Sequence, residues 1–155
     1  MYNVFVERRL IDNVDYCAFV LEGNGVFLHK TWAYKMPSGV KPNARLAYID
    51  YVAKVAKYIK SLVDYGELKD DKFCFLTTHA TCADYINNLR SFGDIGSKPP
   101  KSYFSTAWNL YAVLEKFSNY TFEYRDWATK AKTYASPKYV ESEKREKAID
   151  AFVDM

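Results

Sequence analysis

One long amphipathic stretch limits the folds open to this chain of 155 residues. Between Asn43 and Val63, apolar residues recur at steps of three and four, the spacing of one face of an α-helix. Pro42 disfavours an earlier helical turn, and the Asn43 side chain can accept a hydrogen bond from a first-turn amide. We expect the helix to end near Tyr65-Gly66, because glycine commonly follows a helix. A helix with one apolar face requires a sheet or other helices to cover it.

Three β-rich runs precede this helix. Strands are expected over residues 4–6, 16–21 and 26–34, joined by turns at Asp12-Asn13 and Gly23-Asn24-Gly25. The short connections predict an antiparallel meander.

Strand and helix patterns alternate after the long helix. The compact apolar run 73–78 is typical of a strand covered on both faces, and therefore of an interior strand. Helices are expected over 81–92 and 106–117, then a strand over 121–127 and a last helix that begins at Ser136-Pro137. The predicted order is strand, strand, strand, helix, strand, helix, helix, strand, helix.

Composition adds general limits. With 49% apolar residues, residues 1–155 suit a single domain around one core, and the net charge of +3 does not require a nucleic acid as partner. The three cysteines, Cys17, Cys74 and Cys82, lack a CxxC spacing and are expected to be buried free thiols in a reducing compartment. The sequence has no apolar run of signal-peptide or membrane-span length, so we expect a soluble, cytoplasmic protein without membrane contact.

The sequence offers no cofactor site and no nucleophilic triad. No glycine-rich phosphate loop follows a strand, and the cysteines lie in apolar contexts. His29 is interpreted as a half-buried strand residue.

The order of elements and the loop lengths resemble the ribonuclease H fold over nearly the whole chain. That resemblance implies an α/β fold with a five-stranded mixed sheet, strands 1–3 antiparallel and helices on its faces. Val4-Phe5-Val6-Glu7 is similar to the family's first strand, which ends in a metal-binding aspartate, and Asn43-Ala44-Arg45-Leu46-Ala47 to the start of its first helix. Phe75-Leu76-Thr77-Thr78-His79 is similar to the fourth strand running into the second aspartate. Trp108-Asn109-Leu110 and Phe122-Glu123-Tyr124 resemble the later helix and the fifth strand.

The resemblance also implies a catalytic site, and this sequence departs from it. Family enzymes use about four carboxylates to hold two divalent ions. Here Glu7 stands at the first carboxylate position, Ala47 at the helix position and His79 at the second aspartate position, while Glu143 and Glu146 are candidates for the last by position. We therefore expect no metal site of the family type. Mg²⁺ or Mn²⁺ would be required only by a divergent nuclease that uses Glu7, His79 and a final-helix glutamate.

His79 has two other interpretations. It is either a hydrogen-bonded structural residue at a strand end or, with Glu7, a ligand for a softer transition metal.

Basic and aromatic residues gather on the long helix. Tyr51, Tyr58, Lys54 and Lys57 lie at or beyond the edge of its apolar stripe and are expected to form an exposed face. Such a face suits nucleic acid, through stacking and phosphate contacts, or a protein partner, unless the tyrosines only flank the core. A second basic stretch precedes the third helix, where family enzymes often grip substrate, and a third covers 130–134. The candidate binding residues are Arg45, Tyr48, Tyr51, Lys54, Lys57, Tyr58, Lys98, Lys101 and Tyr103.

Three functional hypotheses follow. The first is a catalytically degenerate ribonuclease H-like binding module that acts through a protein partner, as a viral or mobile-element factor that modulates or inhibits a host enzyme. The second is a non-cleaving pseudo-nuclease that binds RNA, DNA or their hybrid. The third is the divergent metal-dependent nuclease, so the sequence leaves open whether the protein is an enzyme and favours the view that it is not.

Overall fold

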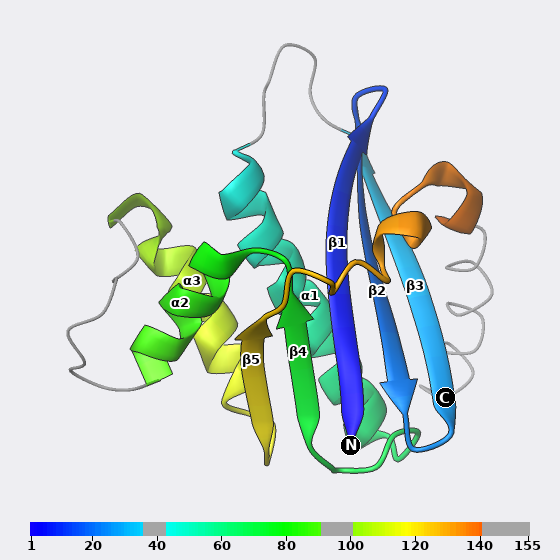
Figure 1. Ribbon diagram of the computed structural model, residues 1–155, viewed down its shortest axis with the longest axis vertical. Helices are drawn as coiled ribbons and strands as arrows, with labels where there is room; N and C mark the ends of the chain where they lie inside the picture. The colour runs from blue at the N-terminus through cyan, green and yellow to red at the C-terminus, as the bar shows by residue number, and fades with distance from the viewer. Residues whose placement is uncertain (36–42, 91–100, 141–155) are drawn as a thin grey trace.

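The computed structural model describes residues 1–35, 43–90 and 101–140 (Figure 1). The described strands are β1 (Tyr2–Ile11), β2 (Val14–Gly23), β3 (Val26–Lys35), β4 (Phe73–Thr77) and β5 (Tyr120–Tyr124). The described helices are α1 (Ala44–Asp64), α2 (Ala80–Arg90) and α3 (Lys101–Leu114), followed by the 3-10 turns η1 (Lys132–Tyr134) and η2 (Pro137–Tyr139).

The strands form one mixed sheet in the order β3-β2-β1-β4-β5. The β1–β2 and β2–β3 pairs are antiparallel, whereas β1–β4 and β4–β5 are parallel. The α/β class, the antiparallel meander and the interior position of β4 are confirmed. The helix predicted from Ser136 is described only as far as η2, because residues 141–155 lie outside the described part.

Several element boundaries differ from the prediction, and β1 differs most. It was expected over 4–6 but spans ten residues, since its ladder with β2 runs from Asn3 opposite Glu22 to Ile11 opposite Val14. Charged residues ended the apolar run in the sequence, yet they continue the strand and point alternately to its two faces.

The sheet separates two layers that differ in size. Tyr2, Val4 and Val6 point to the face covered by α1, α2 and α3, where the main core lies. Phe5 points to the opposite face, where it packs with Ala128 and Ala131. Figure 1 shows the segment with η1 and η2 (orange) crossing this second face over β1, β2 and β3.

The long helix has the predicted ends. The Asn43 side chain accepts a hydrogen bond from the Leu46 amide (3.1 Å). The helix ends at Asp64, and Gly66 has a φ of 81°, a conformation that glycine adopts without strain.

The three cysteines are buried and free, as predicted. Among the described helices, none combines the length and the apolar content that a membrane span requires.

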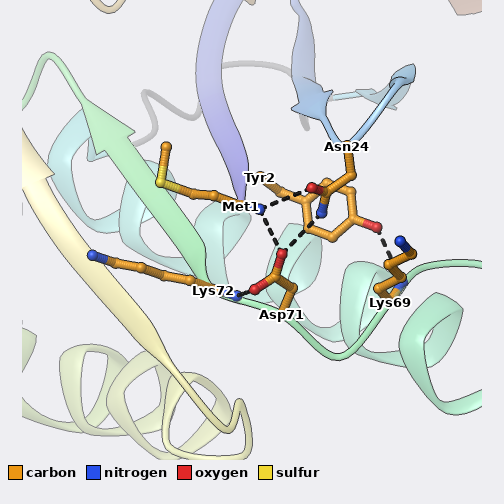
Figure 2. Close-up of polar contacts among 6 residues, drawn as sticks. All are labelled: Met1, Tyr2, Asn24, Lys69, Asp71 and Lys72. Carbon is orange, nitrogen blue, oxygen red and sulfur yellow. Dashed lines mark hydrogen bonds and ion pairs between the residues drawn. The ribbon is translucent and has the colours of Figure 1, made fainter.

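A cluster of polar contacts joins the start of β1 to two loops (Figure 2). The Met1 amine and the Asn24 side chain both donate to Asp71, and the Lys69 amide donates to the Tyr2 hydroxyl (3.0 Å). Hydrogen bonds from the Met1 amine, the Asn24 side chain and the Lys72 amide hold the pKa of Asp71 far below its usual range. The β2–β3 turn is therefore fastened to the loop before β4.

A buried polar trio lies at the other end of the sheet. Asp15 is fully buried, and its Oδ2 accepts hydrogen bonds from Arg8 Nε (2.8 Å) and from the Tyr51 hydroxyl (2.7 Å). Its Oδ1 has no hydrogen-bond partner in the described part of the chain. The trio ties β1, β2 and α1 together, because each residue comes from a different element.

We expect Asp15→Ala to lower the free energy of unfolding by about 3 to 5 kcal/mol, because it leaves the half-buried Arg8 and the buried Tyr51 hydroxyl without their acceptor. Urea unfolding measures the change. The matched control Asp84→Ala, on the exposed side of α2, is expected to shift it by less than about 0.5 kcal/mol. Equal stability of the two variants would contradict the role given to Asp15.

Candidate functional site

The site implied by the sequence lies where β4 ends beside the middle of β1. The parallel pairing places Phe5 opposite Leu76, so Glu7 comes level with Thr78, just beyond the end of β4. The first turns of α1 approach the same point from one face of the sheet (Figure 1).

Glu7 lies on the face of the sheet away from α1, because it alternates with Val6. Its Oε1 accepts a hydrogen bond from the Thr78 hydroxyl (2.9 Å). Burial raises the pKa of Glu7, and the Thr78 bond and the nearby charge of Lys132 oppose this shift only in part. The carboxylate is therefore held in surroundings that disfavour its charge.

Tyr48 and His79 form a stacked pair on the α1 side. Their ring centroids are 3.8 Å apart, and the Tyr48 hydroxyl contacts Thr77 Oγ1 (2.6 Å) and donates to the Val6 carbonyl (3.2 Å). Burial raises the pKa of Tyr48 well above its usual value. Desolvation lowers the pKa of His79, as do the charges of Arg45 and Arg8, so both rings are neutral at pH 7.

The described donors do not fit a pair of divalent ions. No three His, Cys, Asp or Glu side chains come together within residues 1–35, 43–90 and 101–140, and Mg²⁺ prefers an octahedron of oxygens. Glu7 bonds to Thr78 on one side of the sheet, whereas the His79 ring stacks on Tyr48 on the other. Glu143 and Glu146 lie outside the described residues.

The candidate binding residues of α1 divide by exposure. Arg45, Lys54 and Lys57 are exposed and Tyr58 is half-buried, but Tyr48 and Tyr51 are buried. The expected exposure of Tyr51 is wrong.

Tyr51 is buried because of its contacts with β3 and with Asp15. Tyr34 of β3 stacks on the Tyr51 ring (5.3 Å between centroids), while the Tyr51 hydroxyl bonds to Asp15. Lys54 lies over the Tyr34 ring (4.3 Å) and pairs with Asp50 (3.6 Å).

Of the remaining candidate binding residues, Tyr103 is the one whose side chain is described. The Tyr103 hydroxyl accepts a hydrogen bond from Asn43 Nδ2 (2.8 Å), which joins α3 to the start of α1. The expected position of Lys101 and Tyr103 on a loop before the third helix is wrong, because α3 begins at Lys101. The Lys101 side chain and all of Lys98 lie outside the described part.

A basic groove lies between α1 and α3, with a volume of about 210 Å³. Its lining residues are Lys57, Lys60, Ser61, Asp64, Val113 and Lys116. Lys60 pairs with Asp64 (3.0 Å), whereas Lys57 and Lys116 form no ion pair within the described part of the chain. The groove therefore carries a net positive charge.

Sequence reasoning missed Asp15, Lys60 and Lys116. Asp15 shares one face of β2 with Cys17 and Phe19, so period-two spacing alone would have placed its carboxylate in the core. No sequence signal brings Lys116 to Lys57, because the packing of α3 against α1 decides it.

Solved structures confirm the fold. An RNase H1 from the halophilic archaeon Halobacterium salinarum NRC-1 is similar over 91% of this chain and 98% of its own, with a TM-score of 0.64 at 10% identity. The N-terminal RNase H domain of a Mycobacterium tuberculosis protein gives 0.59 at 9% identity, covering 94% of this chain and 96% of that one. LC11-RNase H1, solved in complex with an RNA/DNA hybrid, gives 0.58 at 11% identity, covering 92% and 98%.

The chain therefore has a ribonuclease H-like fold. No family model matches it, and no curated protein sequence matches it. At these identities the likeness shows the fold alone.

We expect Glu7→Gln to stabilise the protein relative to wild type as the pH rises from about 4 to about 7. A carboxyl whose folded pKa is raised contributes its stability below the unfolded pKa and loses it as the pH passes the folded pKa; glutamine does not titrate. Urea unfolding of both proteins across this range measures the difference, with Glu67→Gln as an exposed control. The opposite trend would show that something in the fold favours the charged form of Glu7.

Proposed function

We propose that this chain is a ribonuclease H-like domain that binds nucleic acid without cleaving it. The observation that carries the proposal is the basic groove between α1 and α3. Among its charged residues, three lysines face one aspartate, and Lys57 and Lys116 have no carboxylate partner in the described part.

The positions of the lysines suit a phosphate backbone. Lys57 and Lys60 lie about one turn apart on α1, and Lys116 follows the end of α3, so the charges come from two elements and flank one groove. Lysines that neutralise phosphates release counterions, which gives affinity without sequence preference. Arg45 adds a further exposed positive charge near the start of α1. The hybrid-bound LC11-RNase H1 supports nucleic acid as the ligand class.

The absence of cleavage is inferred from the surroundings of Glu7. Within the described residues Glu7 belongs to no group of three His, Cys, Asp or Glu side chains that could hold a metal ion, and the helix position for a carboxylate is taken by Ala47, next to the buried Tyr48. A two-ion mechanism needs anionic ligands to offset the charge of the ions.

We expect the double variant Lys57→Glu, Lys116→Glu to bind short RNA, DNA and hybrid duplexes more weakly, to a similar degree for each sequence. The slope of log affinity against log salt should fall by about 1 for each lysine that contacts a phosphate. Fluorescence anisotropy in EDTA at several salt concentrations measures both. The matched control Lys69→Glu changes an exposed lysine outside the groove. An unchanged slope in the double variant, or an equal loss in the control, would contradict the proposal.

A protein partner is the second candidate, and the outer face of α3 favours it. Phe104 and Trp108 are 48% and 45% exposed, and their rings lie parallel with centroids 5.9 Å apart. Tyr111 continues the row at 5.3 Å from Trp108. Exposed aromatic residues are enriched at interface hot spots.

This second function predicts a different dependence. Trp108→Ala would then weaken the affinity for a captured partner protein by about thirtyfold, equivalent to about 2 kcal/mol. Lys57→Glu would leave that affinity unchanged. Retention of the partner by Trp108→Ala would remove this candidate. A role as a viral or mobile-element factor that modulates a host enzyme stays a prediction within it.

A further inference from the structure

A second basic surface lies on the face of the sheet opposite α1. It is a depression of about 530 Å³ at the point where η1 and η2 cross that face. Its walls carry three cationic side chains and several hydroxyl groups. They include Arg9, Lys132, Lys138, Thr129, Thr133 and Ser136.

The strands fix the position of this depression. Arg9 shares the outer face of β1 with Phe5, which packs against Ala128 and Ala131. Both alanines are fully buried. The chain therefore packs on the sheet at residues 128 and 131. Lys132 and Thr133 follow directly and line the depression.

Contacts of Tyr134 and Ala135 hold the opposite wall. The Thr31 hydroxyl of β3 donates to the Tyr134 carbonyl (2.7 Å), and the Tyr134 ring stacks on His29 with centroids 4.4 Å apart. Ala135 is buried against Tyr16. The lining residues thus stand on a packed base rather than on an isolated loop.

The described residues supply no ion-pair partner for the cations of the depression. No acidic residue is among its lining residues, and Arg9, Lys132 and Lys138 form no ion pair within the described ranges. By contrast, Lys130 of the same segment pairs with Glu22. Glu7 is the nearest acidic residue in sequence to Arg9 on this face. It bonds to Thr78 and lies within reach of the charge of Lys132, while burial disfavours its charged form.

We propose that this depression is a binding site for a phosphate group. Guanidinium and ammonium groups form charge-assisted hydrogen bonds to phosphate oxygens, and threonine and serine hydroxyls supply further donors. The phosphate belongs either to a nucleic-acid strand or to a free phosphate or nucleotide. The site stands apart from the α1–α3 groove, because the sheet lies between them, and it does not depend on the function proposed above.

The test is a titration of the full chain with inorganic pyrophosphate at low salt, followed by amide chemical shifts and calorimetry. We expect saturable shifts at Thr129, Thr133 and Ser136. Arg9→Ala and Lys132→Ala should each weaken binding about tenfold or more, because each removes a charge-assisted contact. Both residues are exposed, so the variants are expected to fold.

The control is Lys130→Ala, which removes the same charge from the same segment but from outside the depression. It is expected to bind pyrophosphate as wild type does. No saturable binding at millimolar pyrophosphate, or an equal loss in Lys130→Ala and Lys132→Ala, would overturn the site.

A second arm separates the two sources of phosphate. If a short single-stranded oligonucleotide displaces pyrophosphate and loses affinity with Arg9→Ala, the site takes a backbone phosphate. If a nucleoside diphosphate displaces pyrophosphate and the oligonucleotide does not, it takes a free ligand. If neither the oligonucleotide nor the nucleoside diphosphate displaces pyrophosphate, the proposal that the site takes a phosphate of either source is overturned. The Lys57→Glu, Lys116→Glu variant is expected to bind pyrophosphate as wild type does, even where it loses oligonucleotide binding. The two proposals can therefore fail separately.

Discussion

Packing of α1 against one face of the sheet is the interaction on which the rest of the structure depends. The helix buries a continuous apolar face from Ile49 to Leu62 against β1 and against α3. At about 25 cal/mol for each Å² of apolar surface, burial on this scale is the main favourable contribution that a chain of this size has. Polar groups in this interface must then find partners inside it, which explains why Tyr48 bonds to Thr77 and Tyr51 to Asp15.

These internal bonds bear on the chemistry at the end of β4. In the position where the resemblance implies metal-binding carboxylates, the described residues place a neutral tyrosine, a neutral histidine and one carboxylate that burial disfavours in its charged form. Such a set is satisfied by hydrogen bonds and stacking within the protein. Positive charge also lies close to this set, because Arg45 and Arg8 lower the pKa of His79 and the charge of Lys132 acts on Glu7. Further lysines line the α1–α3 groove, and Arg9 and Lys138 line the depression beside η1.

Much of the fold could be predicted from the sequence because it depends on patterns of neighbouring residues. Asn43 and Gly66 predicted the two ends of α1, and the apolar run 73–78 predicted an interior strand. The extent of β1 could not be predicted, because the charges of Arg8 and Arg9 ended the apolar pattern while the ladder to β2 continued. The burial of Tyr51 depends on Tyr34 of β3, and the groove depends on α3 reaching Lys57 of α1. These are contacts between distant segments, which a helical wheel does not contain.

The most direct measurement is incubation of the full chain with a labelled RNA/DNA hybrid, in Mn²⁺ and in EDTA, at a salt concentration where the hybrid is bound. Both the mobility shift and the products are read on gels, with Glu7→Gln beside wild type. We expect a shifted, intact hybrid under both conditions and for both proteins. Cleavage that requires Mn²⁺, stops with EDTA and disappears in Glu7→Gln would contradict it.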